Sequence, residues 1–373
     1  MQFFHDIYQG KRVLVTGHTG FKGSWLSLWL SQLGAEVYGY ALTPPTTPNL
    51  FDDAAVGSVL AGHEIGDVRD REHLKAYVAK AQPEFIFHLA AQPLVRLSYD
   101  EPVETYETNV MGTLNLLEAV RQVDTVRVCQ VVTSDKCYEN REWVYAYREN
   151  DPMGGYDPYS SSKGCTELLV SSYRQSFFHP TRISEHGVSL SSVRAGNVIG
   201  GGDWAEDRII PDCVRALTAG ETIVVRNPHA IRPWQHVLEP LSGYLWLAVR
   251  QYQEPGQFEE GWNFGPMGAG NVNVRKIVEQ VIHAWGAGQW HSPEKEASCH
   301  EANFLKLDIT KAKSLLAWDP VCTVSEAVAD TIAWYRSRHE HREDSMRAFT
   351  LGQIKNYCSK AKKHEFVWAK GDE

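Results

Sequence analysis

The sequence offers little for a disulfide framework or a structural zinc site. Its seven cysteines are odd in number, scattered over 373 residues and never spaced as C-x-x-C. Disulfide-rich secreted domains, by contrast, usually carry an even number of cysteines in a short chain. We therefore expect no metal and a reducing compartment, the cytoplasm.

Long apolar runs and dense positive charge are also missing. No uncharged apolar segment reaches the length that spans a bilayer, and the stretch from Met1 to Arg12 lacks the apolar core of a signal peptide. The formal net charge is −9, with no basic stripe to offset it. These absences argue against a membrane and against nucleic acid as a partner. An anionic small molecule stays compatible, because a few local arginines can hold a diphosphate.

The sequence does contain an alternation of short apolar runs and helical patterns. Runs of β type lie at residues 12–16, 36–40, 85–88, 126–132 and 188–193. Helical patterns lie between them, for example at 23–33 and at 71–81, where Asp70 suits the N-cap. This order predicts an α/β fold of the Rossmann type, a doubly wound parallel sheet with right-handed crossovers.

The sequence pattern changes near residue 195, beyond which glycines and prolines interrupt short predicted helices and strands. We expect a dinucleotide-binding domain over residues 1–195, to which a segment around 230–255 returns. Residues 196–338 are expected to form a smaller α/β lobe over the carboxyl ends of the strands, where it would bind the substrate. Residues 339–373 read as a charged C-terminal tail.

A glycine-rich loop, Gly17-His18-Thr19-Gly20-Phe21-Lys22-Gly23, connects the first strand to the first helix. Gly17 permits a tight turn, Gly20 lets the backbone approach a pyrophosphate, and Gly23 lets helix and strand pack closely. The helix N-terminus adds free N–H groups and a positive dipole end. A glycine-rich turn without a ligand is the alternative, but the flanking strand and helix favour a dinucleotide site.

An acidic ribose anchor is missing from the end of the second strand. The segment Tyr40-Ala41-Leu42-Thr43 has no Asp or Glu for a ribose and no Arg for a 2′-phosphate. The residues here therefore leave NAD and NADP both open. Asp67-Val68, after the third strand, is a candidate acceptor for the adenine amino group, or else a simple turn.

Tyr159 and Lys163 are spaced to share one face of a helix. A nearby ammonium lowers the pKa of a phenol, which is otherwise a poor base at neutral pH, and it can also hold ribose hydroxyls. A second group, Ser134-Asp135-Lys136, ends a strand of the same sheet and would project toward the same edge. Ser134 can hydrogen-bond a substrate hydroxyl or carbonyl beside Tyr159. The alternative is a strand-end cap at Ser134 with an exposed ion pair after it.

Together these motifs resemble the extended short-chain dehydrogenase/reductase family over roughly residues 10–335. The resemblance implies NAD as cofactor, a lobe that binds nucleotide sugars, and homodimers or homotetramers built on helices near 98–121 and 159–178. The cofactor contacts that it implies are the glycine loop, Asp67, Val68, Leu89, Ala90, Ala91, Asn109, Tyr159 and Lys163. The substrate contacts that it implies are Asn197, Arg208 and Arg232. Surface ion pairs are the alternative for the two arginines.

Asp135 narrows the resemblance to the nucleotide-sugar 4,6-dehydratases, since simple 4-epimerases need no acid after the triad hydroxyl. Residues 17–25, 134–138 and 194–204 resemble the branch of these dehydratases that acts on CDP-glucose. The resemblance implies CDP-glucose as substrate and a 4-keto-6-deoxy sugar nucleotide as product, for deoxysugar and O-antigen biosynthesis. The alternatives are a sister dehydratase acting on GDP-mannose, a 4-epimerase and a non-catalytic dinucleotide sensor.

The chemistry that this resemblance implies has three stages. Tyr159 takes the C4 hydroxyl proton while hydride leaves C4, then the C5 proton and the C6 hydroxyl are lost as water with Asp135 as acid, and hydride returns to C6. Related dehydratases carry a glutamate as the C5 base where this chain has Lys136. A lysine acts as a base only if its pKa is depressed, by desolvation or by cations such as Lys163. We expect Lys136 to be that base.

Overall fold

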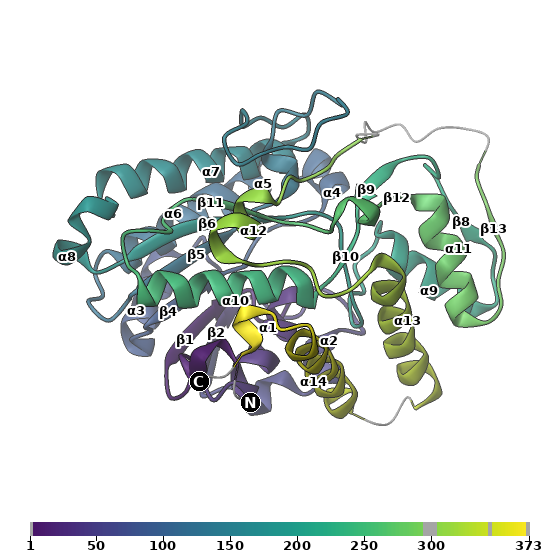
Figure 1. Cartoon of the computed structure of the whole chain (residues 1–373), viewed down its shortest axis with the longest axis horizontal. Helices are drawn as coiled ribbons and strands as arrows, with labels where there is room; N and C mark the ends of the chain where they lie inside the picture. The colour runs from purple at the N-terminus through teal and green to yellow at the C-terminus, as the bar shows by residue number, and fades with distance from the viewer. Residues whose placement is uncertain (1–2, 294–303, 342–344, 371–373) are drawn as a thin grey trace.

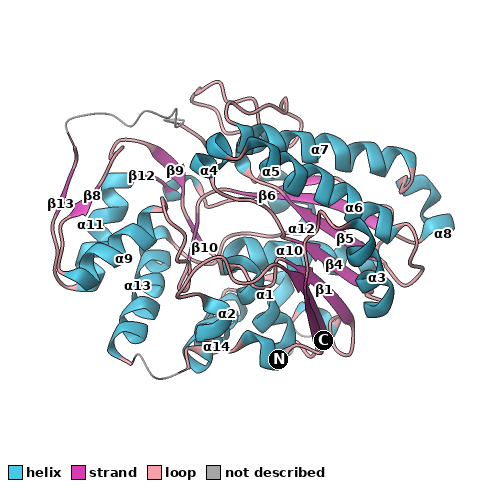
Figure 2. Ribbon diagram, turned by 180° about the vertical axis from the view of Figure 1, so that it is seen from behind, coloured by secondary structure: helices cyan, strands magenta, loops and turns pink. Residues whose placement is uncertain are grey.

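A seven-stranded, wholly parallel sheet forms the larger domain (Figure 1, Figure 2). The computed structural model describes residues 3–293, 304–341 and 345–370. The strands are β1 (Arg12–Thr16), β2 (Glu36–Ala41), β3 (Gly62–Ile65), β4 (Phe85–His88), β5 (Val128–Val132), β6 (Ser189–Ala195) and β11 (Gly261–Phe264). Their order is β11-β6-β5-β4-β1-β2-β3, which reverses between β1 and β4, where doubly wound sheets bind ligands. The predicted Rossmann-type fold is confirmed.

Two apolar cores cover the two faces of this sheet. The covering helices are α1 (Phe21–Gln32), α3 (Arg71–Ala81), α6 (Gly112–Val120), α7 (Pro158–Ser176) and α10 (Leu238–Gln253). Val13 and Val15 pack with α1 and α10, whereas Leu14 between them packs with α3, α6 and α7. The alternation follows from the two-residue period of a strand, and it makes β1 a strand buried on both faces.

The smaller lobe lies beside the carboxyl ends of the central strands (Figure 1). Its helices are α9 (Ile209–Ala219), α11 (Val274–Trp285) and α13 (Val324–Glu340), and α11 packs against both of the others. Its short strand pairs are β7 (Val198–Ile199) with β10 (Gln235–His236), β8 (Ile223–Val224) with β13 (Trp290–His291), and β9 (Ile231–Pro233) with β12 (Asn271–Asn273).

Short helices complete the described chain. The α-helices among them are α2 (Leu50–Asp53), α4 (Val95–Asp100), α5 (Pro102–Tyr106), α8 (Ile183–His186) and α12 (Thr310–Leu316). Single 3₁₀ turns lie at Phe4–Asp6, Val56–Val59, Asp135–Cys137, Pro180–Arg182, Gly268–Gly270 and Val367–Ala369, and a π turn at Glu107–Met111. The predicted N-cap of α3 is present, because the Asp70 carboxylate accepts the His73 N–H at 3.1 Å.

The chain returns to the larger domain more extensively than expected. The returning segment predicted at 230–255 contains α10, but the chain continues into β11, which adds the seventh strand beside β6. The sequence of β11, Gly-Trp-Asn-Phe, alternates two strand-favouring aromatic residues with Gly and Asn, which disfavour strands, so its local signal is weak over four residues. It becomes one because β6 offers an edge to pair with.

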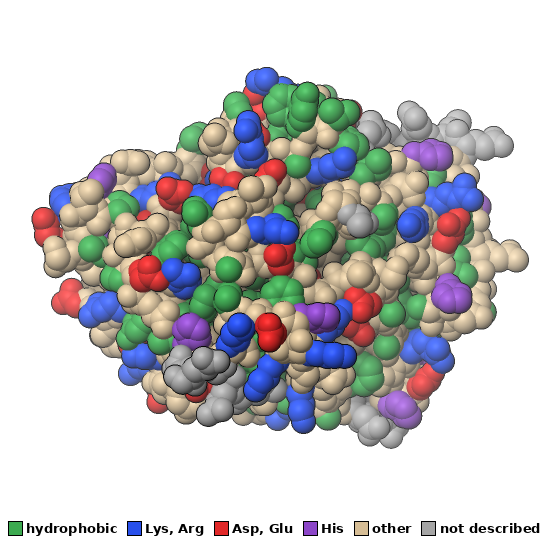
Figure 3. Space-filling model, viewed as in Figure 1, with side chains coloured by type: hydrophobic (Ala, Val, Ile, Leu, Met, Phe, Trp, Pro, Cys, Tyr) green, Lys and Arg blue, Asp and Glu red, His purple; other side chains and the backbone are tan. Residues whose placement is uncertain are grey.

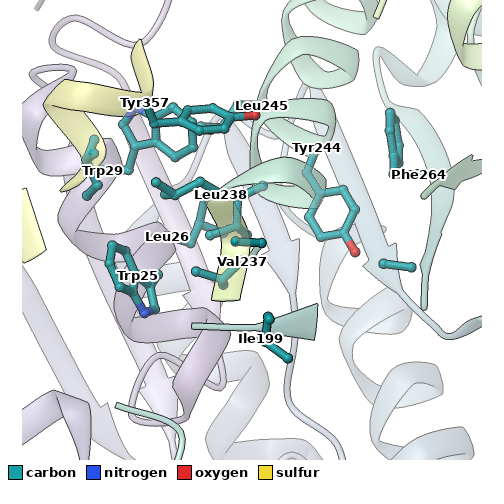
Figure 4. Close-up of a cluster of buried hydrophobic side chains, with 14 of the residues drawn as sticks. Trp25, Leu26, Trp29, Ile199, Val237, Leu238, Tyr244, Leu245, Phe264 and Tyr357 are labelled. Carbon is teal, nitrogen blue, oxygen red and sulfur yellow. The ribbon is translucent and has the colours of Figure 1, made fainter. Parts of the chain in front are cut away.

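The expectation of a charged C-terminal tail also needs correction. Residues 347–363 form helix α14, which packs on α1, and Trp368 is fully buried, with its ring stacked 5.0 Å from Phe4. Ile354, Tyr357 and Ala361 form a buried stripe among the lysines. The lysines of this segment lie on the outer face of the helix, so the composition alone does not reveal the buried stripe. Figure 4 shows Tyr357 among the side chains of α1 and α10.

The charges of the outer surface are mixed. On the face drawn in Figure 3, Lys and Arg lie interspersed with Asp and Glu. No helix within the described ranges is long and apolar enough to cross a membrane. Over the same residues, no three His, Cys, Asp or Glu side chains are grouped to hold a metal ion. The cysteines within these ranges are free thiols, and Cys299 lies outside them.

Candidate functional site

A cavity of 1670 Å³ lies between the sheet and the smaller lobe. The residues that follow β1, β4, β5 and β6 line one side, and segments 197–212 and 224–234 line the other. Pockets for a single drug-sized ligand measure about 300–1,000 Å³. This cavity therefore has room for two ligands, such as a dinucleotide and a nucleotide sugar.

The glycine loop is held by close backbone contacts at one end of this cavity. Gly17 has a φ of +74°, and a Cβ there would lie 2.8 Å from the backbone nitrogen of Ala90. A Cβ at Gly23 would lie 2.1 Å from the carbonyl oxygen of Gly17. Gly20 is the N-cap of α1 and no side chain caps that end, so the first N–H groups of the helix are available to a phosphate. The loop thus fits the pyrophosphate of a dinucleotide.

His18 is the one loop residue that does not line the cavity; Gly17, Thr19, Gly20, Phe21, Lys22 and Gly23 all do. Its ring is fully buried behind the loop, 5.4 Å from the ring of His63 and 5.5 Å from that of Phe51. Burial, and then the charge of His63, lower the pKa of His18 to about 4. His18 is therefore a neutral support for the loop and not the cofactor contact that the sequence predicts.

Asn109 likewise lies outside the cavity lining. Its Oδ1 accepts the Gln92 N–H at 2.9 Å, and its Nδ2 donates to the Ser162 hydroxyl at 2.8 Å. Asn109 thus ties the loop after β4 to α7. It positions the predicted contacts Leu89, Ala90 and Ala91, which do line the cavity.

Asp67 and Val68 line the cavity next to the end of β2. The Asp67 carboxylate accepts hydrogen bonds from the Arg69 side chain and backbone, both at 2.8 Å. Burial acts to raise the pKa of Asp67, but the hydrogen bonds from Arg69 outweigh it and hold that pKa below its usual value. Leu42 and Thr43 line the same region without a carboxylate, so the ribose has no acidic anchor on β2.

Tyr159 and Lys163 come together with Ser134 at the edge of β5. Tyr159 is 8% exposed and Lys163 is 4% exposed, and the Lys163 Nζ donates to the Val132 carbonyl at 3.3 Å. Burial lowers the pKa of Lys163 to about 8. Burial raises the pKa of Tyr159 to about 12, whereas a hydrogen bond with Ser134 and the charge of Arg208 lower it. Arg208 therefore acts on the phenol, a role that the sequence did not predict.

The turn at residues 134–136 presents a carboxyl group to the same space. The Ser134 hydroxyl donates to Asp135 Oδ1 at 3.1 Å and accepts the Lys136 N–H at 3.2 Å. Asp135 Oδ2 has no hydrogen-bond partner within the described residues and lies against Gly196, whose Cβ would be 3.1 Å away. Burial raises the pKa of Asp135, although the charge of Lys136 opposes the shift. A buried carboxyl with a raised pKa and an unbonded oxygen suits a proton donor.

Several cations line the cavity on the side where the substrate is expected. The three predicted substrate contacts, Asn197, Arg208 and Arg232, all line it, and Arg208 Nη1 lies 2.8 Å from Asp203 Oδ2. Lys22 adds a positive charge near Asp135, and burial followed by the charge of Arg208 lowers its pKa to about 8. The lining also contains carboxylates, among them Asp203 and Asp207, so these cations are local candidates to hold a diphosphate within a lining of mixed charge.

Sequence reasoning missed three further arginines of the lining: Arg215 on α9, and two that share a partner, Arg96 on α4 and Arg226 after β8. The latter two contact one oxygen of Asp207, with Nη1–Oδ1 distances of 3.4 Å from Arg96 and 2.6 Å from Arg226. No motif contains either residue. Only the packing of α4 against the smaller lobe brings them together, so no local signal was available.

Known proteins with similar sequences are nucleotide-sugar enzymes. The model of the GDP-mannose 4,6-dehydratase family matches residues 14–331. The CDP-glucose 4,6-dehydratase of Salmonella typhimurium is 54% identical over 354 residues, which cover 95% of this chain and 98% of that protein. The dTDP-glucose 4,6-dehydratase of Xanthomonas campestris is 27% identical, over 86% of this chain and 92% of that protein.

Solved structures share the fold at lower identity. The UDP-glucose 4-epimerase of Thermotoga maritima, solved with UDP-glucose, has a TM-score of 0.72 and 23% identity, covering 87% of this chain and 98% of that one. The dTDP-glucose 4,6-dehydratase of Bacillus anthracis, solved in complex with NAD, has a TM-score of 0.71 and 21% identity, covering 88% and 97%. The likeness extends over both the sheet and the smaller lobe.

We expect Gly23→Ala to weaken NAD⁺ binding by about 10-fold or more, because the methyl group would overlap the Gly17 carbonyl and open the loop. Titration calorimetry with NAD⁺ measures the change. Gly352→Ala on α14 is the matched control, since a Cβ there meets nothing within 4 Å. Equal affinities of the two variants would contradict this account of the loop.

We expect Lys163→Met to abolish catalysis yet stabilise the ligand-free protein. Burial of the ammonium lowers the Lys163 pKa from 10.5 to about 8, so removing the charge should raise the free energy of unfolding at pH 7 by about 2–3 kcal/mol. As pH rises from 8 to 10.5, the folded wild-type protein loses this proton before the unfolded chain does. Wild-type stability should therefore rise relative to the variant, and the gap should narrow.

Urea unfolding of both proteins at neutral pH and near pH 9.5 measures this difference. A Lys163→Met protein that is less stable than wild type at pH 7 contradicts the burial argument. If the difference in free energy of unfolding between the two proteins widens as pH rises, the pKa of Lys163 is not lowered in the folded protein.

Proposed function

Because this chain belongs to the GDP-mannose 4,6-dehydratase family, we propose that it dehydrates CDP-glucose to CDP-4-dehydro-6-deoxyglucose. The observation that carries the proposal is the Asp135 carboxyl beside Tyr159 and Ser134. It is buried, its pKa is raised, and its Oδ2 has no hydrogen-bond partner in the described part of the chain. An epimerase has no leaving hydroxyl to protonate and needs no such acid. The 54% identity to a CDP-glucose 4,6-dehydratase supports cytidine as the base.

The cofactor proposed here is NAD. The glycine loop fits a pyrophosphate, and the end of β2 carries no arginine to hold the 2′-phosphate of NADP. The nicotinamide, when bound, would accept the hydride from C4 and return it to C6, so that the reaction consumes no redox equivalent.

In the oxidation step Tyr159 would take the proton of the C4 hydroxyl. A phenol with a pKa of about 12 holds its proton too tightly for this at neutral pH. The hydrogen bond with Ser134 and the charge of Arg208 oppose that shift, and the Lys163 ammonium is held close by at the end of β5. These groups would stabilise the phenolate as the proton moves.

In the elimination step the C4 ketone makes the C5 hydrogen acidic. Lys136 would take that proton, and Asp135 would protonate the C6 hydroxyl, so that water leaves and a C5–C6 double bond forms. Once hydride has returned to C6, Lys136 would give a proton back to C5. The balance is the loss of one water from the sugar.

The diphosphate of the substrate would lie among Asn197, Arg208 and Arg232, which line the cavity on the side of the smaller lobe. Arg96 and Arg226, both paired with Asp207, also line the cavity. Guanidinium groups bind phosphate oxygens in bidentate fashion, which lets a protein of net charge −9 hold an anion.

The proposal extends to a homodimer. Three apolar side chains on neighbouring elements are exposed: Val103 on α5 (69%), Met111 on the π turn (47%) and Leu168 on α7 (62%). Leu117 on α6, by contrast, is buried in the core and is not available to a partner. A gathering of exposed apolar side chains on neighbouring helices favours a protein interface. Sedimentation of the full chain would measure the mass in solution, and a monomer would refute this part.

Product analysis tests the function directly. The protein is incubated with NAD⁺ and, separately, with CDP-glucose, dTDP-glucose, UDP-glucose, GDP-glucose and GDP-mannose. We expect CDP-glucose to be turned over, with loss of water and a 4-keto-6-deoxy sugar by NMR. A product that keeps its C6 hydroxyl would identify an epimerase. Binding of NAD⁺ without turnover of any sugar would favour a dinucleotide sensor.

We expect Lys136→Met to slow product formation by about 100-fold or more, because the variant lacks the base for C5. In D₂O the wild-type product should carry deuterium at C5, and the variant should exchange this position far more slowly. Lys11→Met, which removes a lysine paired with Glu84 on the outer side of the sheet, is the control. Deuterium entry at the wild-type rate in Lys136→Met means that another group is the base.

A further inference from the structure

A buried ion pair lies behind the turn that carries Ser134, Asp135 and Lys136. Glu167 lies on α7, one helical turn after Lys163, and Arg194 lies in β6; each is 4% exposed. Arg194 Nε donates to Glu167 Oε1 at 2.8 Å, and Nη2 donates to Oε2 at 2.7 Å. Two parallel bonds of this kind set the orientation of both groups as well as their separation.

The same pair holds both ends of the turn. Glu167 Oε1 also accepts the hydroxyl of Thr133, the residue before Ser134. Arg194 Nη1 donates to the Tyr138 hydroxyl at 2.6 Å, two residues beyond Lys136, and the guanidinium lies 5.1 Å from the centre of the Tyr138 ring. Both ends of the segment from Thr133 to Tyr138 are thereby bonded to the Glu167–Arg194 ion pair.

The Glu167–Arg194 pair is anchored on helix α7 through Glu167. Glu167 follows Lys163 by four residues and Tyr159 by eight, so all three lie on one face of the helix. Asp135 and Lys136, in contrast, belong to the end of β5. The pair is therefore a side-chain link between the element that carries the redox groups and the element that carries the elimination groups.

We propose that Glu167 and Arg194 are positioning residues for the elimination step, holding Asp135 and Lys136 in register with Tyr159 and Lys163. Neither residue lines the cavity, so they act through the turn and not on the substrate. A buried ion pair adds little net stability over an apolar pair of the same size, whereas its geometry is specific. The inference rests on the proposed function, since it assigns elimination to Asp135 and Lys136.

The two halves of the reaction should respond differently to loss of this ion pair. Oxidation at C4 uses Tyr159 and Lys163, which α7 holds, and depends on the turn only through the hydrogen bond of Ser134 with Tyr159. Elimination needs Asp135 and Lys136 at C6 and C5, and an error of about 1 Å in position can cost about 100-fold in rate. A loosened turn should therefore let the 4-ketone and reduced cofactor accumulate.

Arg194→Lys and Tyr138→Phe test this in the full chain. Arg194→Lys keeps the positive charge opposite Glu167 but loses the bidentate guanidinium. Tyr138→Phe removes the hydroxyl that accepts from Arg194 and that also donates to Asn263 Oδ1 at 2.7 Å. We expect kcat to fall by about 10- to 100-fold in Arg194→Lys and less in Tyr138→Phe, with KM for CDP-glucose and NAD⁺ affinity nearly unchanged. We also expect transient absorbance of reduced nicotinamide, and faster hydrogen exchange of the amides at 133–138.

Glu239→Gln is the matched control. Glu239, on α10, is another buried carboxylate, 1% exposed, and it accepts hydrogen bonds from the Tyr357 hydroxyl and the Val321 N–H. It should lower the melting temperature without reduced cofactor accumulating. If Arg194→Lys behaves like this control, or slows both half-reactions equally, the inference is overturned.

Failure of the proposed function gives a different result. In that case the wild-type protein dehydrates no nucleotide sugar, and hydrogen exchange then decides whether the pair orders the turn. Unchanged exchange at 133–138 in Arg194→Lys overturns the inference on its own.

Discussion

The burial of charged groups at one edge of the sheet is the constraint on which this site depends. Lys163, Asp135 and Tyr159 lie where water is largely excluded, and burial is the main cause of the pKa shift of each. The shifts move Asp135 toward the neutral acid and Lys163 toward neutrality. These two shifts bring Asp135 and Lys163 closer to proton transfer near neutral pH, whereas burial makes the Tyr159 phenol hold its proton more tightly, so that Tyr159 depends on its neighbours.

Such burial is possible because the parallel sheet and the lobe enclose the site together. β1, β4, β5 and β6 end at a common edge, and segments 197–212 and 224–234 close the cavity over it. The Glu167–Arg194 pair then fixes the turn after β5 against α7. Charges that would be costly alone are tolerated because each has a partner or an opposite charge nearby.

Local features were predictable from local spacing. Asp70 caps α3, the glycine loop follows β1, and Tyr159 and Lys163 share a helical face, because each depends only on residues a few positions apart. His18 and Asn109 were assigned to the cofactor by motif position alone, and neither lines the cavity. β11 and α14 escaped prediction because a sheet edge in one case and the packing of α1 in the other decides their state.

The sequence by itself determined the fold class, the glycine loop and the set of groups able to react, because each of these depends on the spacing of residues close together in the chain. Tertiary structure alone decided which of those groups is left unpaired. Among the residues that the structure describes, Asp135 Oδ2 has no hydrogen-bond partner, Arg96 and Arg226 meet at Asp207, and Arg194 reaches both Glu167 and Tyr138. Each of these outcomes requires segments distant in sequence to arrive at one place, and only the packed sheet and lobe bring them there.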